Sequence, residues 1–262
     1  MKFLDLNNVG GRLANQMYFC LHAFVTAKRL NEEVKYIPNR ACVQFNNIER
    51  LKSLNMGEFI ADGIIDEQNI IYGVGDDYLQ RVDVDFSDND IQEFISKTVF
   101  NCEKFINFKN ERLKYLQESC VIHVRNGDYL EYDEFGCFDR KDYLKTCLNY
   151  INCDITPHKA DRVVVVSDDS SKNKAEYSEI LKSKFKEIEY VSSDDLLADM
   201  FTIALGKYKI IWNSTFSYWG AFIGNILLND RHLTFAPSVF TKHNPTSDHC
   251  LKGWNIMKVK MV

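Results

Sequence analysis

The second half of the chain alternates between two kinds of segment. Short apolar runs rich in β-branched residues, of which 163–166 is the clearest, are separated by stretches whose apolar residues recur every three to four positions. We expect strands over 120–125, 162–167, 188–191, 208–212 and 233–236, and helices over 140–151, 172–184, 193–205 and 216–227. Strands and helices in alternation are typical of a doubly wound, largely parallel sheet. The chain of 262 residues is therefore predicted to have an α/β fold.

The first part of the chain opens in the same way. Residues 3–6 are expected to form a strand, and a glycine turn then leads into a helix over 13–30. Further helices are expected over 88–99 and 107–117, and we place the division between two Rossmann-like half-domains near residue 118. The glycines at 73 and 75 are not followed by the third glycine of the dinucleotide fingerprint G-x-G-x-x-G. We therefore expect neither a nicotinamide nor a flavin cofactor.

Charge and composition exclude several classes of protein. The 32 basic and 37 acidic residues give a net charge of −5, and no basic stripe suits a nucleic-acid backbone, so we expect no nucleic-acid partner. No apolar run approaches the ~20 residues of a membrane span, which leaves attachment to a membrane surface and the oligomeric state open. None of the eight cysteines has a C-x-x-C spacing, so a structural zinc site is not expected. The N-terminus lacks the pattern of a signal peptide, and we expect a cytoplasmic protein.

Polar side chains gather at the end of the strand expected over 120–125. His123 and Arg125 lie within this apolar run, and Asp128 follows the break at Gly127. Because ligands of open α/β sheets bind just beyond the carboxyl ends of the strands, we expect these three side chains to form part of a ligand site. The alternative is a strand end that carries an ion pair between Arg125 and Asp128 with a purely structural role.

Two later strand ends also carry polar groups. Asp168 and Asp169 follow the strand over 162–167, where the simplest interpretation is a helix cap. A cluster of hydroxyl and amide side chains opens the helix over 216–227, and free N–H groups at such a position favour phosphate. The alternative for this cluster is N-capping of the helix alone. Its members are Asn213, Ser214, Thr215 and Ser217.

Five further residues, at three places in the chain, are candidates for ligand or metal binding. Asp199 lies at the margin of the apolar stripe of its helix, where one carboxylate could accept both N–H groups on the edge of a guanine base, or could form a salt bridge instead. Arg12 and Asn15 stand at the opening of the first helix, where an anion can bind. Asp83 and Asp85 have the spacing of a metal pair, but their acidic surroundings favour a solvated face. We expect no metal site.

Three segments carry longer motifs in order along the chain. Residues 11–18 are GRLANQMY, residues 121–129 are VIHVRNGDY, and residues 211–221 are IWNSTFSYWGA. They resemble the G-[GR]-x-G-N-Q-[ML]-F, H-x-R-x-G-D-Y and S-N-S-[ST]-F-S-W-W-[GA] motifs of the α-1,2-fucosyltransferases, which form glycosyltransferase family eleven. The chain is rather short for this family, and Ala14 replaces the usual glycine. Asn126 replaces a common second arginine, which leaves one cation fewer for the phosphates.

This resemblance implies a GT-B-like enzyme with two lobes that face each other across a cleft. Residues 1–118 would form the acceptor lobe and 119–262 the donor lobe of an inverting transferase, which moves L-fucose from GDP-fucose to a glycan acceptor, usually to the 2-hydroxyl of galactose, without a metal or other cofactor. The alternatives are a GT-B enzyme that uses another nucleotide sugar and a non-catalytic glycan- or nucleotide-binding relative.

The resemblance also assigns roles to single residues. Arg125 would hold the β-phosphate, and Asp128 is the nearest candidate for a general base; these two are the predicted catalytic residues. The predicted substrate-binding residues divide between guanine (His123, Asp199), phosphate (Ser214, Thr215, with Asn213 and Ser217 beside them) and contacts to the donor from the first lobe (Arg12, Asn15).

Overall fold

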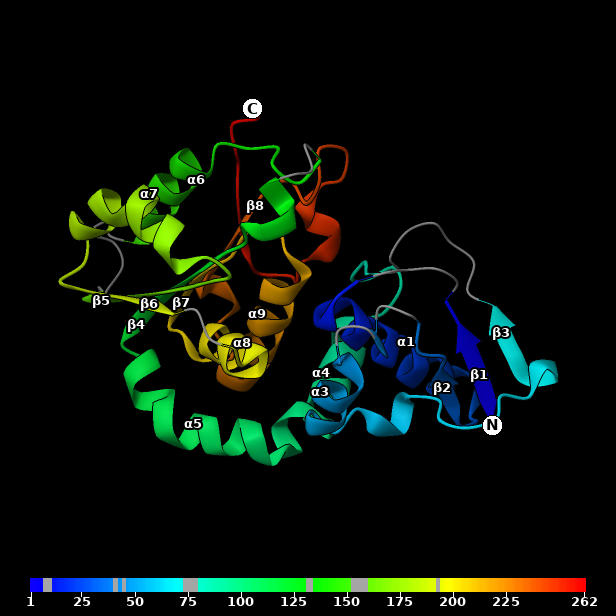
Figure 1. Cartoon of the computed structure of the whole chain (residues 1–262). Coiled ribbons are helices and arrows are strands. Elements are labelled where there is room, and N and C mark those ends of the chain that lie inside the picture. The colour runs from blue at the N-terminus through cyan, green and yellow to red at the C-terminus, as the bar shows by residue number, and fades with distance from the viewer. Residues whose placement is uncertain are drawn as a thin grey trace. The chain divides into compact units, whose positions relative to one another are not determined.

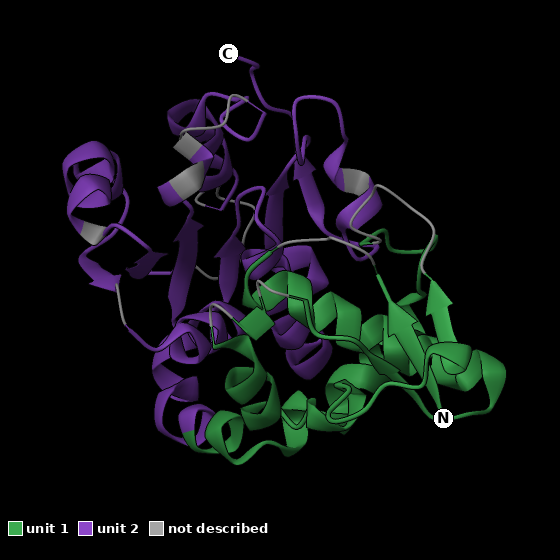
Figure 2. Cartoon of the chain, turned by 45° about the vertical axis from the view of Figure 1, so that its right-hand side comes forward, with its two compact units in different colours: residues 1–107 green, residues 108–262 purple. Residues whose placement is uncertain are grey.

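The structure is a computed structural model that describes residues 1–6, 11–39, 42–43, 46–72, 80–130, 134–151, 160–191 and 194–262. The glycines at 73 and 75 and the expected helix start at 193 lie outside these residues. The chain divides into two compact units, Met1–Asn107 and Phe108–Val262 (Figure 2). The boundary falls inside helix α5 (Glu103–Leu116), whereas the sequence pattern placed it near residue 118. The difference arises because the later turns of α5 pack on the second unit, where the Phe108 ring lies 5.8 Å from that of Phe201.

Unit 1 is built on a parallel sheet with the strand order β2-β1-β3. The strands described are β1 (Lys2–Asp5), β2 (Val34–Tyr36) and β3 (Ile70–Tyr72). Helix α1 (Leu13–Leu30) connects β1 to β2, as the apolar spacing predicted, and is followed by α3 (Asn47–Ser53) and α4 (Asp88–Lys97). Ser87 caps α4 through a capping box, which confirms the expected start of this helix. Short 3-10 turns are Gly57–Phe59, Glu67–Asn69 and Val99–Asn101.

Unit 2 contains a larger sheet whose described strands are all parallel and follow the order β6-β5-β4-β7-β8-β9. Taken in chain order this is 3-2-1-4-5-6, the strand order of the dinucleotide-binding Rossmann fold. The strand order reverses between β4 and β7, so the ligand crevice of such a sheet lies beyond the carboxyl ends of these two strands. The strands are β4 (Ser119–Val124), β5 (Arg162–Ser167), β6 (Glu187–Val191), β7 (Tyr208–Ile210), β8 (Thr234–Pro237) and β9 (Asn255–Met257).

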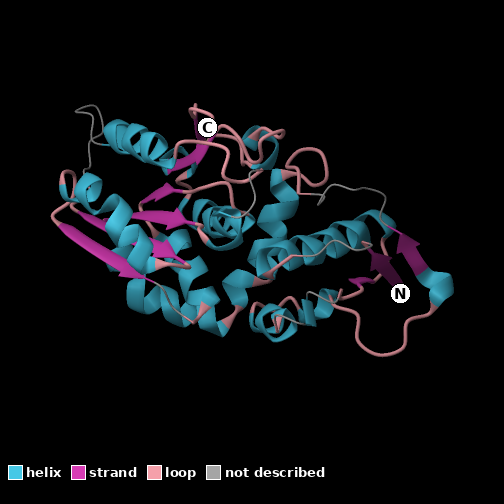
Figure 3. Ribbon diagram, turned by 45° about the horizontal axis from the view of Figure 1, so that its top comes forward, coloured by secondary structure: helices cyan, strands magenta, loops and turns pink. Residues whose placement is uncertain are grey.

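Helices cover both faces of the unit 2 sheet (Figures 1 and 3). One face is covered by α6 (Arg140–Ile151) and α7 (Ser170–Lys182), and the other by α8 (Leu196–Leu205) and α9 (Thr215–Leu228). Because side chains alternate along a strand, Ile122 and Val124 of β4 pack with α6 and α7, and His123 points to the opposite face. The α/β fold with parallel sheets is thus confirmed, and the cleft between two facing lobes stays a prediction.

A polar network is buried on the side of unit 2 where β7, α9 and the segment before β9 meet. Lys209 Nζ is fully buried and donates to Asp230 Oδ2 at 2.6 Å. Asn225 Nδ2 donates to Asp230 Oδ1 at 2.7 Å, and Asn225 Oδ1 accepts from Trp254 Nε1 at 2.6 Å. Burial lowers the pKa of Lys209, and the neighbouring Asp230 carboxylate acts against this shift. The network fixes one charge pair inside the core.

The cysteines that the structure describes are all free and buried. Burial raises the pKa of their thiols, to about 12 at Cys147. Among the described residues, no helix has both the length and the apolar character that crossing a bilayer requires.

Candidate functional site

Arg125 follows the last residue of β4 and forms an ion pair with the neighbouring strand end. Its Nη1 donates to Asp168 Oδ2 at 2.8 Å, and Asp168 comes directly after β5. The sequence pattern did not predict this partner, because Asp128 was the only residue considered as the ion-pair partner of Arg125. Asp128 lies in the 3-10 turn Gly127–Leu130, and its side chain is outside the described part of the structure. A guanidinium held by a carboxylate has a fixed direction, which is what recognition of an anion requires.

The turn after Arg125 is closed by the same carboxylate. The backbone N–H of Asn126 donates to Asp168 Oδ1 at 2.9 Å, so the two carboxylate oxygens bridge consecutive residues. Gly127 has a positive φ of 23°, and a Cβ atom there would lie only 2.7 Å from Asp168 Oδ2. Glycine is therefore required both for the backbone angle and for the approach of Asp168.

The side chain of Asn126 is buried and forms hydrogen bonds inside the protein. It is 1% exposed, and its Nδ2 donates to Asn173 Oδ1 of α7 at 3.0 Å and to Ser167 Oγ at 3.4 Å. Position 126 therefore joins α7 to two strand ends. The residue that departs from the resembled motif has a structural use in this chain.

His123 is buried next to Arg125 on the face of the sheet that α8 and α9 cover. Its ring centroid lies 5.5 Å from that of Phe216 in α9. Burial and, secondarily, the charge of Arg125 lower the pKa of His123 to about 3, so the imidazole is neutral at pH 7. Within the described residues its buried Nδ1 has no hydrogen-bond partner. A neutral ring with one unused nitrogen is suited to a hydrogen bond with a ligand.

Asp199 lies in the first turn of α8, on the helix layer toward which His123 points. The side chain is buried, in agreement with its predicted place at the edge of the apolar stripe. The helix starts at Leu196 because the Asp195 carboxylate caps the N–H groups of Leu197 and Ala198, so the predicted start at 193 was too early.

The polar cluster after β7 divides into two pairs. Asn213 and Ser217 are fully buried and hold the local backbone: Asn213 Nδ2 donates to the carbonyls of Phe135 and Phe240 at 2.9 and 2.8 Å. Ser217 Oγ contacts the carbonyls of Trp212 and Ser214 at 3.0 and 2.8 Å.

The other pair stands at the start of α9. Ser214 occupies the N-cap position but makes no side-chain cap hydrogen bond, and Thr215 is the first residue of the helix. Simple N-capping by the Ser214 hydroxyl, the alternative considered from the sequence, is not what the structure describes. The hydroxyl and the first N–H groups of a 14-residue helix stand together at the crevice edge of the sheet.

Arg12 and Asn15 belong to unit 1. Arg12 is exposed at the N-cap position of α1, and Asn15 Oδ1 accepts from Gln80 Nε2 at 3.3 Å. Gly11 has a φ of 120°, and a Cβ atom there would overlap the Asn15 side chain. The glycine of this motif is therefore needed to place Asn15.

The acidic residues of the 83–90 stretch do not form a metal site in the structure. Asp85 Oδ2 accepts from the backbone N–H of Arg81 at 2.8 Å and pairs with its guanidinium at 3.4 Å. Across the described residues, no group of three or more His, Cys, Asp or Glu side chains is placed to hold a metal ion.

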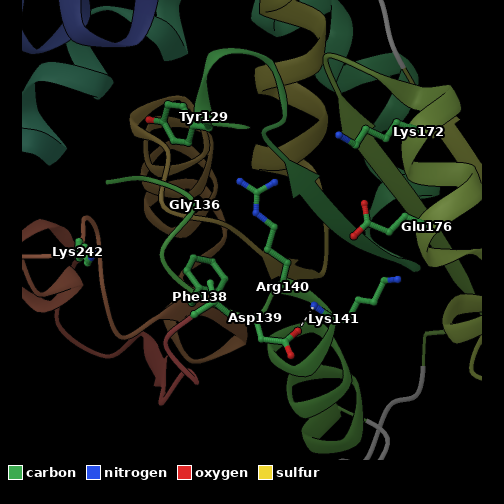
Figure 4. A pocket seen from close by; sticks show the side chains of 10 residues that line it. Tyr129, Gly136, Phe138, Asp139, Arg140, Lys141, Lys172, Glu176 and Lys242 are labelled. Atoms are coloured by element: carbon green, nitrogen blue, oxygen red, sulfur yellow. Dashed lines mark hydrogen bonds between the residues drawn. The ribbon is translucent and has the colours of Figure 1, made fainter. Parts of the chain in front are cut away.

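A cavity of about 780 Å³ lies at the start of α6 and α7 (Figure 4). Sequence reasoning missed it, because its basic residues are single charges at helix starts and in loops that no motif marks. Tyr129, whose ring centroid lies 5.6 Å from the Arg125 guanidinium carbon, lines the cavity, so it adjoins the Arg125 site. The lining residues are Tyr129, Gly136, Phe138, Asp139, Arg140, Lys141, Lys172, Glu176, Lys242 and Val262.

Comparisons with known proteins agree with the motif assignment. The sequence profile of glycosyl transferase family 11 matches residues 76–257. The alpha-1,2-colitosyltransferase of Escherichia coli is 28% identical over 144 residues, which cover 52% of this chain and 46% of that protein. The chain thus spans about half the length of this curated relative.

Two solved structures are similar at low sequence identity. The fucosyltransferase NodZ from Bradyrhizobium has a TM-score of 0.46 at 11% identity, with 84% of this chain and 91% of that chain covered. A mutant of Arabidopsis thaliana FUT1 in complex with GDP has a TM-score of 0.44 at 12% identity, with 86% and 69% covered. The family profile covers more than half of the sequence, and the chain belongs to glycosyl transferase family 11.

Proposed function

We propose that this glycosyltransferase moves L-fucose from GDP-fucose to a hydroxyl of a glycan, with the 2-hydroxyl of a galactose as the expected acceptor group, and inverts the sugar at C1. The observation that carries the proposal is the pair of side chains at the end of β4. Arg125 follows β4, one of the two strands between which the strand order reverses; Asp168, after β5, holds it, and a neutral, buried His123 lies beside it.

The donor would lie along the carboxyl edge of the unit 2 sheet. His123 and Asp199 would bind guanine, since a neutral imidazole can accept or donate and a carboxylate can accept two N–H groups. The diphosphate would bind Arg125 and the start of α9, where the Ser214 hydroxyl is not used for capping. Arg12 and Asn15 are the proposed contacts from unit 1, and their role rests on the motif resemblance.

The proposed reaction is a direct displacement at C1 of the sugar. The acceptor oxygen forms a bond to C1 while the bond from C1 to the diphosphate breaks, and the acceptor proton passes to a base, for which Asp128 is the candidate. Negative charge grows on the departing GDP, and a guanidinium fixed beside it stabilises the transition state more than the ground state. Arg125 and the α9 N-terminus would supply this charge stabilisation, so we expect turnover that a chelator does not change.

The variant Arg125→Lys tests the catalytic role. Lysine keeps the charge but cannot bind two oxygens in one plane, so kcat should fall by about 10²–10³ while the melting temperature and part of the GDP affinity are kept. Arg112→Lys, a substitution at a half-exposed arginine of α5 that pairs with Glu189, is the matched control and should leave kcat unchanged. A variant that melts early but turns over normally would make Arg125 a structural residue. Failure of the wild-type protein to turn over any nucleotide sugar, with GDP, UDP or ADP as the nucleotide, would favour the non-catalytic alternative.

A second donor is favoured by one observation. The curated relative is an alpha-1,2-colitosyltransferase, and colitose is L-fucose without its 3-hydroxyl. Comparing kcat/KM for GDP-fucose and GDP-colitose distinguishes the two donors from each other. Comparing inhibition by GDP with inhibition by UDP tests whether the donor carries a different nucleotide. NMR of the product establishes the linkage.

A further inference from the structure

The cavity at the start of α6 and α7 has an excess of positive charge. One of its two acidic residues, Asp139, is already hydrogen-bonded within the protein: its Oδ1 accepts from the N–H groups of Lys141 and Asp142 and so caps α6. None of its four cationic side chains forms an ion pair with another described residue. These cations are Arg140, Lys141, Lys172 and Lys242, which Figure 4 shows around the cavity with Glu176. The chemistry of this lining fits an anion.

Arg140 is the most enclosed of these cations. Its guanidinium carbon lies 5.0 Å from the centroid of the buried Trp212 ring. Its Nη2 is buried and, within the described residues, has no hydrogen-bond partner. Burial lowers the pKa of Arg140, and Tyr177, Glu176 and Asp168 act against that shift, so the side chain stays protonated. A buried N–H group of a cation without an acceptor is costly, and an oxyanion in the cavity would satisfy it.

The cavity adjoins the Arg125 site in two ways. Tyr129 lines the cavity and also lies over the Arg125 guanidinium. Asp168, which pairs with Arg125 at 2.8 Å, is also among the carboxylates whose charge acts on Arg140. Position 126, where the resembled motif has a second arginine, holds a side chain that is buried and bound to α7. Tyr129 and Asp168 thus link Arg140 of α6 to the Arg125 site, whereas position 126 supplies no cation.

We propose that Arg140 is the second guanidinium that binds the diphosphate of the nucleotide sugar, and that the basic cavity is the oxyanion site in which it does so. This inference rests on the proposed function, because it takes the donor to be a nucleoside-diphosphate sugar. Arg140 then contacts the leaving diphosphate from the face of the sheet that α6 and α7 cover, and Arg125 contacts it from the strand end.

The test is calorimetric titration of guanosine, GMP and GDP into the whole chain. Arg140→Gln should weaken GDP binding about 10- to 100-fold, the value of a lost hydrogen bond to a charged group, and leave guanosine binding unchanged. Arg140→Lys should recover part of the GDP affinity because the charge is restored. Lys145→Gln, an exposed substitution on the same helix, is the matched control and should change neither affinity.

Three results would overturn the proposal. If Arg140→Gln binds GDP as the wild type does but has a raised KM for the acceptor, the cavity binds an anionic group of the acceptor instead. If guanosine and GDP binding fall together, Arg140 acts through the fold. A wild-type protein that prefers UDP would refute the guanine assignment alone, and the comparison of uridine with UDP would then test Arg140. If no nucleoside diphosphate binds, both proposals fail.

Discussion

The buried imidazole of His123 predicts a specific loss of stability in acid. Its pKa is about 3 in the folded protein, against about 6.5 in an unfolded chain, so between these values the unfolded state binds a proton that the folded state does not. Stability therefore falls as the pH drops below about 6.5, and this one group accounts for about 2 kcal/mol at about pH 5. The effect continues to grow until the pH approaches the folded-state value.

Urea unfolding at about pH 7.5 and about pH 5 measures this contribution when wild type, His123→Gln and His232→Gln are compared. His123→Gln should lose about 2 kcal/mol less than the wild type on acidification, because glutamine has no proton to bind. His232→Gln is the control, since His232 is exposed, and should follow the wild type. Acidic groups contribute to all three proteins alike and cancel in the comparison. Equal losses in wild type and His123→Gln would refute the buried, neutral imidazole.

Three other substitutions test separate features. Asp230→Ala should lower the free energy of unfolding by about 3–5 kcal/mol, because it leaves the Lys209 ammonium buried without its carboxylate. Lys209→Met combined with Asp230→Leu should leave the free energy of unfolding, measured by chemical denaturation, nearly unchanged. Equal losses in the two variants would contradict this account of the pair. Gly127→Ala should lower kcat by about 10², because the added methyl displaces the carboxylate that holds Arg125, and should lower the free energy of unfolding by about 1–2 kcal/mol because of the positive φ; normal kinetics would show that the turn adapts. Gly224→Ala should cost about 1–3 kcal/mol or more in urea unfolding, because the methyl would overlap a carbonyl of α8, and an unchanged midpoint would refute the tight packing of α8 against α9.

The parts of the fold that depend on local sequence were predicted well. Helices α1 and α6 have the predicted bounds, because their apolar spacing is regular over many residues. The β9 strand, Asn255–Met257, was missed, since three half-exposed residues at a sheet edge show no alternation. The β7 strand ends at Ile210 rather than 212, because the buried residues that follow it prolong the apolar run without pairing.

The site was only partly predictable, because local sequence patterns do not show which side chains from different elements meet. His123 and Arg125 could be placed at a strand end because motif and strand coincide in the sequence. The pairing of Arg125 with Asp168 depends on the register between β4 and β5, which local patterns do not encode. Arg140 could not be found, because a single arginine on a predicted helix has the same pattern whether it faces solvent or a cavity.

The buried cysteines allow the unfolding of each part of the protein to be followed by chemical labelling. A thiol reacts as the thiolate, and burial both shields these sulfurs and raises their pKa, so a thiol reagent should modify each one only when its surroundings open. In a Cys153→Ser background, mass spectrometry of samples quenched at successive times would give an opening rate for each site. Because both units carry such thiols, the order of labelling at low urea would show which unit opens first. The reporters are Cys20, Cys42 and Cys102 in unit 1 and Cys120, Cys137, Cys147 and Cys250 in unit 2.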